Sequence, residues 1–284
     1  MILIRLISKL PFPVLYAISD FLFAMSYRLV GYRRKMVQKN LRNSFPEKSD
    51  ADLRQIEKQF YRNLCDYAVE MLKLLTISRE GLTTRMVFTN PEVLMKYARN
   101  KQSVLNLASH HFNWEWLLTT ASVIFPTGLD FVYQPVNSPF FERITLESRT
   151  RFGAHAVKRD EVARELVKRK HIARNLAIVG DQYPGYKHDK KFETKFMNQD
   201  TVFFYGSYQV ALLTQYPAVY HQLRKVRRGY YEVTSVELAT PPYDKDDDSL
   251  MKSYIKAVEK VINDRPSEWL WSHNRWKKRH LEGS

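Results

Sequence analysis

The residues best suited to chemistry lie in one short segment, in which four residues separate His110 from Glu115. A turn that enters a helix can bring such a pair together. An imidazole held by a carboxylate at one nitrogen presents its other nitrogen as a base, which can remove a proton from a hydroxyl group. The chain has no Gly-x-Ser-x-Gly elbow and no placed cysteine to act as the nucleophile. We therefore expect a substrate hydroxyl to attack directly, as in acyl transfer.

Other roles for this segment stay open on spacing alone. His110 could be a core histidine that is hydrogen-bonded to a carboxylate. A metal site is not expected, because the His-Glu-x-x-His pattern is absent and no third ligand cluster accompanies His110, His111 and Glu115. The single cysteine, Cys65, cannot form an intramolecular disulfide, and its apolar neighbours predict a packed position in a helix.

The segments around the pair predict a turn between a strand and a helix. Residues 103–108 have the composition of a buried strand, and helical character resumes from Trp116 to Ile124. A second short buried strand, at residues 176–179, ends at Gly180-Asp181-Gln182. Sites in α/β sheets lie beyond the carboxyl ends of the strands, which is where we expect both His110 and Asp181.

The rest of the chain alternates between strand and helix patterns, which predicts an α/β fold with a mixed central sheet flanked by helices. Only 9 glycines and no Gly/Ser-rich or Pro-rich stretch occur, so we expect one domain over residues 33–284 after an N-terminal segment, residues 1–32. Further strands are predicted at residues 129–133, 218–223 and 231–236. Helices are predicted at residues 49–75, 94–97, 140–152, 161–170, 209–214 and 250–263.

The net charge of +15 indicates a negatively charged partner, which could be nucleic acid, an anionic membrane surface or an acidic substrate. Zinc ligands, an RNP-type aromatic strand and a basic heptad helix are absent from the sequence, so nucleic acid is not the expected partner.

The first thirty residues are rich in apolar side chains, but charges and prolines interrupt them. Their uninterrupted apolar stretches are about half of the roughly 20 residues that a spanning helix needs. Helical spacing over residues 15–23 predicts a helix that lies in the membrane interface, and the cations that follow suit anionic headgroups. The alternative is a helix packed on the protein's own core.

The chain resembles a known family, the bacterial lipid A biosynthesis acyltransferases, also called late or secondary acyltransferases. In that family the reactive segment reads His, a hydrophobic residue, Gly, Asn, Trp, Glu. The match here is residues 110–115, with Phe112 in place of the usual Gly. Further matches cover nearly the whole chain. They are Tyr133-Gln134-Pro135, with Gln134 where Arg is usual, then Arg149, Gly153, Gly180-Asp181-Gln182 and the Trp- and Arg-rich segment 269–276.

The resemblance implies transfer of an acyl group from a thioester of acyl carrier protein or coenzyme A to a hydroxyl of a lipid A precursor. No further cofactor is implied. It places the enzyme at the cytoplasmic face of the inner membrane, as a peripheral or monotopic protein. In this interpretation His110 is the base and Glu115 orients it, Arg149 stabilises the oxyanion, and substrate contacts come from Asn113, Arg149, Asp181 and Gln182.

Two other functions remain open. The acceptor could be another lipid, a glycolipid or a pigment, because related proteins share the His/x4/acid element. The chain could instead be a non-enzymatic basic protein that binds membranes or nucleic acid. The positive surface suits a phosphorylated acceptor and an acidic carrier protein equally well.

Overall fold

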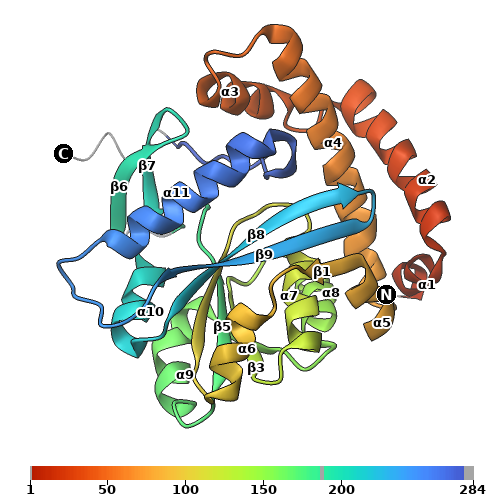
Figure 1. Ribbon diagram of the computed structural model, residues 1–284. Helices are drawn as coiled ribbons and strands as arrows, with labels where there is room; N and C mark the ends of the chain where they lie inside the picture. Colours follow the sequence, from red (N-terminus) through yellow and green to blue (C-terminus); the bar gives the residue numbers. More distant parts are fainter. Residues whose placement is uncertain (1, 186–188, 278–284) are drawn as a thin grey trace.

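A seven-stranded sheet forms the centre of the molecule, in the order β1-β9-β8-β2-β5-β3-β4 (Figure 1). The computed structural model describes residues 2–185 and 189–277. Neighbouring strands are parallel except for β8 and β9, which are antiparallel, so the predicted mixed sheet is confirmed. The strands are β1 (Met86–Phe88), β2 (Val104–Ala108), β3 (Gly128–Tyr133), β4 (His155–Lys158), β5 (Arg174–Val179), β8 (Ala218–Arg227) and β9 (Tyr230–Ala239). A separate antiparallel hairpin contains β6 (Lys191–Phe196) and β7 (Gln199–Phe204).

Helices flank the sheet, as the sequence predicts. They are α1 (Ile2–Lys9), α2 (Phe12–Phe23), α3 (Arg34–Ser44), α4 (Asp50–Lys73), α5 (Arg79–Arg85), α6 (Glu92–Arg99), α7 (Trp114–Ile124), α8 (Pro139–Thr150), α9 (Val162–Lys168), α10 (Gly206–Thr214) and α11 (Ser249–Asp264). Short π or 3₁₀ turns occur at Ala24–Val30, Arg159–Glu161 and Pro266–Glu268.

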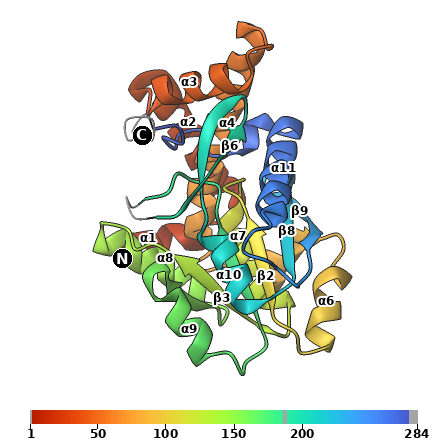
Figure 2. The same ribbon diagram turned by 90° about the vertical axis from the view of Figure 1, so that its left-hand side faces the viewer.

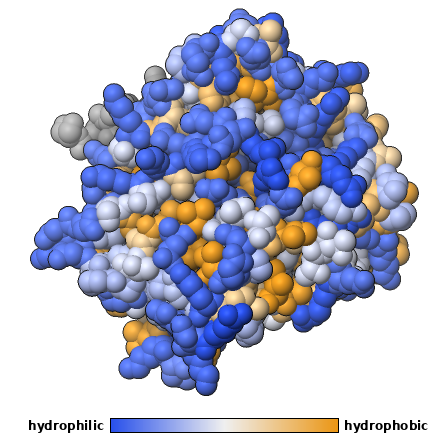
Figure 3. Space-filling model, in the orientation of Figure 1, coloured by the Kyte–Doolittle hydropathy of each residue, from blue (hydrophilic) through white to orange (hydrophobic). Residues whose placement is uncertain are grey.

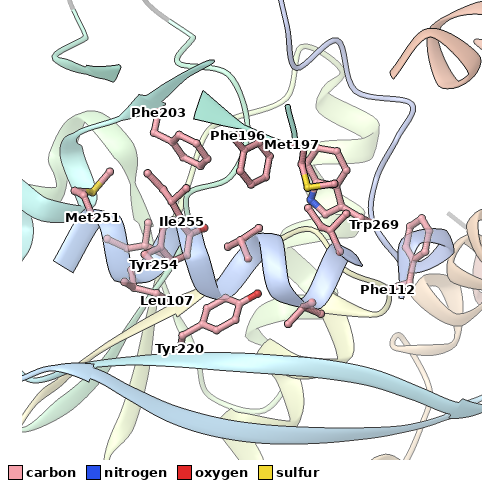
Figure 4. Close-up of a cluster of buried hydrophobic side chains, with 14 of the residues drawn as sticks. Leu107, Phe112, Phe196, Met197, Phe203, Tyr220, Met251, Tyr254, Ile255 and Trp269 are labelled. Atoms are coloured by element: carbon pink, nitrogen blue, oxygen red, sulfur yellow. The ribbon is translucent and has the colours of Figure 1, made fainter. Parts of the chain in front are cut away.

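Each face of the sheet carries its own apolar cluster, because successive side chains of a strand point to opposite faces. On β2, Leu105 and Leu107 belong to the cluster that includes side chains of α4, α10 and α11. Figure 4 shows Leu107 and Tyr220 of this cluster beside Tyr254 and Ile255 of α11. Val104 and Ala108 belong to the other cluster, with α5, α6 and α7. Both faces of β2 are thus buried, as expected for a central parallel strand.

The long helix α4 confirms the prediction for residues 49–75 closely. Ser49 caps its N-terminus, where the Ser49 Oγ accepts a hydrogen bond from the Asp52 backbone N–H at 3.2 Å. Cys65 lies buried on this helix, in the packed role predicted for it. The cap satisfies a backbone N–H of the first turn and so stabilises the helix on which α2 packs.

The N-terminal helix α2 packs along α4 through polar contacts on one face. The Tyr16 hydroxyl donates to Glu70 Oε1 at 2.9 Å, and the Ser19 hydroxyl donates to Asp66 Oδ1 at 2.7 Å. Its outer face exposes Val14, Phe21 and Leu22. Figure 3 shows orange apolar residues along the right-hand edge of the molecule, where α2 lies in Figure 1. One face of α2 is therefore bound to the protein and the other is apolar and exposed.

The helical stretch from Phe12 to Val30 is longer than the predicted interfacial helix over residues 15–23. Among the described residues it is the one helix that is long and apolar enough to cross a membrane by length and composition. The prolines and charges within the first thirty residues predict shorter apolar stretches. The helix continues past Phe23 as a π-helical turn over Ala24–Val30, which accounts for the extra length.

Candidate active site

Strand register brings His110 opposite Asp181. Strands β2 and β5 are parallel neighbours in which Ala108 pairs with Val179, and the two site residues each follow two positions later. The His110 Nδ1 lies 2.6 Å from Asp181 Oδ1, and the His110 backbone N–H donates to Asp181 Oδ2 at 2.9 Å. Both residues lie beyond the carboxyl ends of their strands, the place expected from the sequence.

Two aromatic side chains hold this pair in position from the C-terminal part of the chain. The Tyr254 hydroxyl of α11 donates to the Ala108 carbonyl at 2.8 Å and accepts from the Gly180 N–H at 3.2 Å. It thereby joins the ends of β2 and β5. Trp269 Nε1 donates to Asp181 Oδ2 at 2.6 Å. The C-terminal tryptophan segment, noted in the sequence for its family resemblance, is thus part of the wall of the site.

Local charge determines the protonation of the pair. Burial alone would raise the pKa of Asp181, but the charge of His110 and hydrogen bonds from His110 and Trp269 outweigh it and hold that pKa below its usual range. Asp181 is therefore ionised at neutral pH and accepts hydrogen bonds only, so the His110 Nδ1 must carry the proton. The Nε2 is left as the basic nitrogen, and no hydrogen bond from residues 2–185 or 189–277 reaches it.

The adjacent histidine has a different environment. His111 is buried, and its Nδ1 lies 2.7 Å from the Ser109 hydroxyl. Burial lowers the pKa of His111 to about 4, so this ring is neutral at pH 7. It is absent from the cavity wall, whereas His110 lines the cavity. Of the two histidines, His110 is the one placed to meet a substrate.

Glu115 contacts Arg149 rather than His110, contrary to the expectation that it orients the histidine. Arg149 donates from Nε to Glu115 Oε2 at 2.7 Å and from Nη2 to Oε1 at 2.6 Å. Burial would raise the pKa of Glu115, but the charge of Arg149 and its hydrogen bonds hold the pKa below its usual value. The first turn of α7 directs Glu115 toward α8, which carries Arg149. The carboxylate that contacts the His110 ring is that of Asp181.

Asn113 is fully buried just before the first turn of α7 and does not lie on the cavity wall. Its Oδ1 accepts from the Trp116 N–H at 3.1 Å, and its Nδ2 donates to Glu70 Oε2 at 2.9 Å. This geometry makes Asn113 the N-cap of the helix, which conflicts with the expectation that it contacts substrate. Gln182 and Arg149 line the cavity, and their contact with substrate stays a prediction.

Phe112, at the position where the family has glycine, is also fully buried. Its ring packs against Phe60, Tyr67 and Trp114, with centroid distances of 5.9, 5.4 and 5.6 Å. The aromatic side chain thus fills space between α4 and the site. Figure 4 shows Phe112 at the edge of the buried cluster that contains Trp269.

A cavity of about 480 Å³ extends from His110 between the sheet and α7. Its walls are mainly apolar, from Leu117, Leu118, Ala121, Phe125, Leu129 and Phe131. Polar side chains also line it, among them Gln134, Glu142, Arg159 and Gln182. The cavity therefore combines polar groups, the His110 ring and a mainly apolar wall that suits a hydrocarbon chain.

A polar group that the sequence analysis missed faces the interior of this cavity. Asn106, Asn175 and His221 come from adjacent strands β2, β5 and β8, and all three line the cavity. His221 Nε2 lies 2.9 Å from Asn106 Oδ1, and Asn106 Nδ2 donates to Asn175 Oδ1 at 3.1 Å. Burial lowers the pKa of His221 to about 4. A polar residue within each of three buried strands was the signal available in the sequence.

Within residues 2–185 and 189–277, no group of three or more His, Cys, Asp or Glu side chains is arranged to hold a metal ion. The described site has a histidine on a carboxylate, a guanidinium held by a second carboxylate, and a mainly apolar cavity. These parts suit proton removal from a hydroxyl and attack on an acyl carbonyl whose chain lies in the cavity.

Comparisons with known proteins relate the chain to acyltransferases. A family model described as bacterial lipid A biosynthesis acyltransferase matches residues 1–278. The chain is also 23% identical, over 281 residues, to the lipid A biosynthesis lauroyltransferase of Escherichia coli (strain K12). That alignment covers 96% of this chain and 89% of the relative.

Proposed function

The chain belongs to the bacterial lipid A biosynthesis acyltransferases, and we propose that it moves a fatty acyl group from an acyl thioester to a hydroxyl of a lipid A precursor. The observation that carries this proposal is the His110 ring, with one nitrogen on ionised Asp181 and the other available at the head of an apolar cavity. Membership of the family supports acyl transfer in lipid A biosynthesis. The donor and the roles of the residues are inferred from the site.

In the proposed reaction, His110 Nε2 takes the proton of the acceptor hydroxyl as its oxygen attacks the thioester carbonyl. A C–O bond forms, and the carbonyl becomes a tetrahedral oxyanion. Collapse of this intermediate breaks the C–S bond, and the imidazolium returns its proton to the departing thiolate. Asp181 stabilises the imidazolium between these two transfers. No acyl-enzyme forms, because the acceptor itself is the nucleophile.

Arg149 is our candidate for stabilising the oxyanion. Its Nε and Nη2 are engaged by Glu115, which fixes the guanidinium where Arg149 lines the cavity. A fixed cation beside the reacting carbonyl stabilises the developing negative charge without reorganisation. Glu115 then acts through Arg149, a role that differs from the one its spacing to His110 predicts. Gln182, also on the wall, is the candidate for positioning the acceptor.

The apolar cavity is the proposed site for the acyl chain. Asn106 precedes His110 by four residues, and strand geometry of about 3.3 Å per residue puts it about 13 Å from the base. The C–C bond length of about 1.5 Å gives an advance of about 1.3 Å per methylene in an extended chain. A chain of roughly ten carbons therefore reaches the polar group at Asn106. The name of the lauroyltransferase relative supports a donor of medium length.

The proposed partners follow from charge and from the apolar N-terminus. A net charge of +15 suits a phosphorylated lipid acceptor and an acidic carrier protein, with acyl carrier protein or coenzyme A as the carrier of the thioester. The exposed apolar face of α2 supports attachment to the cytoplasmic face of the inner membrane.

Transfer of a labelled acyl group from acyl carrier protein or coenzyme A to a lipid A precursor tests the proposal directly. We expect His110→Ala to lower the transfer rate by about 10²- to 10⁴-fold, the usual contribution of a general base. The matched control is His171→Ala, because His171 is an exposed histidine outside the cavity. A His110→Ala rate within a few-fold of the wild-type rate would show that the base is elsewhere.

A further inference from the structure

Exposed apolar side chains that do not belong to the N-terminal helices lie on the rim of the cavity. Val136, Phe140 and Phe141, here called the rim cluster, have exposed fractions of 49%, 43% and 62%. The two phenylalanine rings pack edge to face at 5.5 Å. The Val136 N–H donates to Glu142 Oε2 at 2.9 Å, which ties the loop before α8 to the first turn of that helix. Val136 and Glu142 both line the cavity, so the rim cluster borders its entrance.

The face of α8 that carries the rim cluster also contacts the N-terminal helix α1. Arg5 of α1 forms an ion pair with Glu147 of α8. Phe140 and Glu147 are seven residues apart on α8 and so lie on one face of the helix, about 10 Å from each other. Figure 2 shows α1 beside α8. Because α1 exposes Ile2, Leu3 and Leu6, apolar side chains lie on both sides of the Arg5–Glu147 contact.

We propose that the rim cluster inserts into the lipid bilayer together with α1, so that the cavity entrance opens at the membrane interface. A bilayer fits this surface because α1, which contacts α8, and α2 also expose apolar side chains, and several such segments together suit an extended apolar partner. Exposed cations are interspersed with the apolar residues, among them Arg5, Lys9 and Arg143, and these suit anionic headgroups. A polybasic, aromatic and amphipathic edge of this kind is typical of interfacial binding.

Insertion at the rim has a consequence for substrate entry. A lipid acceptor could move from the headgroup layer to His110 without leaving the interface, while its own chains stay in the bilayer. The membrane would then be bound at two places, α1–α2 and the rim cluster. This surface does not depend on the catalytic role of His110, so the two proposals can fail separately.

A fluorophore placed on the rim cluster tests insertion. The chain has one cysteine, and Cys65→Ser provides a background for single labels. We would attach an environment-sensitive dye at Phe141→Cys, at Leu6→Cys on α1, and at Leu213→Cys on α10 as a matched control that is 59% exposed. The vesicles would contain phosphatidylethanolamine and phosphatidylglycerol, with a nitroxide quencher on the acyl chains in a second series.

We expect blue-shifted emission and acyl-chain quenching at positions 141 and 6, and neither at position 213. Emission at position 141 that stays unchanged on vesicles, whatever position 6 does, would overturn the proposal. A second measurement uses the full chain with Phe140→Ser and Phe141→Ser, compared with Leu213→Ser. We expect the double variant to bind vesicles at least about tenfold more weakly, because two partly exposed aromatic side chains lose their apolar contact. Equal binding by these two variants would also contradict insertion.

The catalytic proposal is kept separate by one further variant. His110→Ala should bind vesicles as the wild type does, although it no longer transfers acyl groups. A loss of vesicle binding in this variant would mean that the chosen binding assay reports folding rather than insertion, and the labels at positions 141 and 213 would then decide.

Discussion

Two buried carboxylates beside the cavity differ in what their partners can do. Asp181 is bound to His110, and Glu115 is bound to Arg149, each through hydrogen bonds of 2.9 Å or less. Both carboxyls have a lowered pKa because a positive partner outweighs the effect of burial. Arginine cannot give up its proton in a protein, whereas imidazole exchanges a proton near neutral pH. One pair can therefore move a proton, and the other can only hold a charge in place.

This difference teaches that a short spacing in sequence does not identify the partners of a catalytic pair. Glu115 is near His110 along the chain, but α7 turns its carboxylate toward α8. Asp181 is 71 residues away, and the parallel register of β2 and β5 brings it into contact. The neighbouring strand of the sheet thus brings a carboxylate to His110, and helix α7 brings a carboxylate to Arg149.

The largest expected effect comes from Asp181→Asn. An asparagine amide would donate to the ring and favour the wrong tautomer of His110, so we expect the transfer rate to fall by about 10²- to 10⁴-fold. The measurement is kcat/KM for acyl transfer at neutral pH. Asp130→Asn is the control, because Asp130 is also buried and ion-paired but its partners are Arg169 and Arg174. A rate close to wild type in Asp181→Asn would remove the distinction between the two carboxylates.

Breaking the Glu115–Arg149 pair should lower the free energy of unfolding. Either Glu115→Gln or Arg149→Met leaves one buried charge without its partner, which typically costs about 3–5 kcal/mol. We expect the double variant to recover part of this free energy of unfolding but not the transfer rate, since the cation stays absent. Urea unfolding of the two single variants and the double variant makes the measurement. A double variant no more stable than the singles would mean that the pair does not act as a unit.

Acid should weaken the fold through a buried histidine of the cavity. Burial lowers the pKa of His221 from 6.5 to about 4, so the unfolded chain binds a proton more readily between these values. The stabilisation by neutral His221 is fully present above pH 6.5 and is lost as the pH falls toward 4, on the order of 3 kcal/mol. His221→Gln should therefore reduce the change in unfolding free energy between pH 7 and pH 4.5. An unchanged pH dependence would mean that His221 is not buried in its neutral form.

The smallest effect concerns the choice of acyl chain. Ala121 lines the cavity, and Ala121→Phe adds a ring to its wall. Overfilling of a packed wall costs about 1–3 kcal/mol, so transfer of the longest accepted chains should fall about tenfold while shorter chains are affected less. Mass spectrometry of products from mixed donors measures the preference. Ala163→Phe, at an exposed position on α9, is the control. A uniform loss over all chain lengths would place the chain elsewhere.

Much of the fold could be predicted, because hydrophobic periodicity is a local signal. The Ser49 cap and the three- and four-residue steps after it predict α4, and the apolar runs at residues 103–108 and 176–179 predict β2 and β5. The hairpin β6–β7 was missed. Charged and apolar residues are mixed along Lys191–Phe196, so no apolar run marks this strand, and it is defined by its pairing with β7.

The candidate site could be predicted only in part, because its contacts join residues that are distant in the sequence. His110 and Asp181 could each be placed after a buried strand, but their contact depends on β2 and β5 being neighbours, which no local pattern specifies. The contact of Arg149 with Glu115 likewise depends on how α8 packs against α7. The N-cap role of Asn113 could have been predicted, because an asparagine just before a helical run is a common N-cap.

The proton on His110 Nδ1 tests the central claim most directly. A proton held between an imidazole and a carboxylate gives a strongly downfield ¹H NMR signal, which ¹⁵N labelling of histidine assigns to a ring nitrogen. We predict that the wild type and Glu115→Gln both show this signal, and that His110→Ala and Asp181→Asn do not. A signal that survives in Asp181→Asn and disappears in Glu115→Gln would contradict the account and return the orienting role to Glu115.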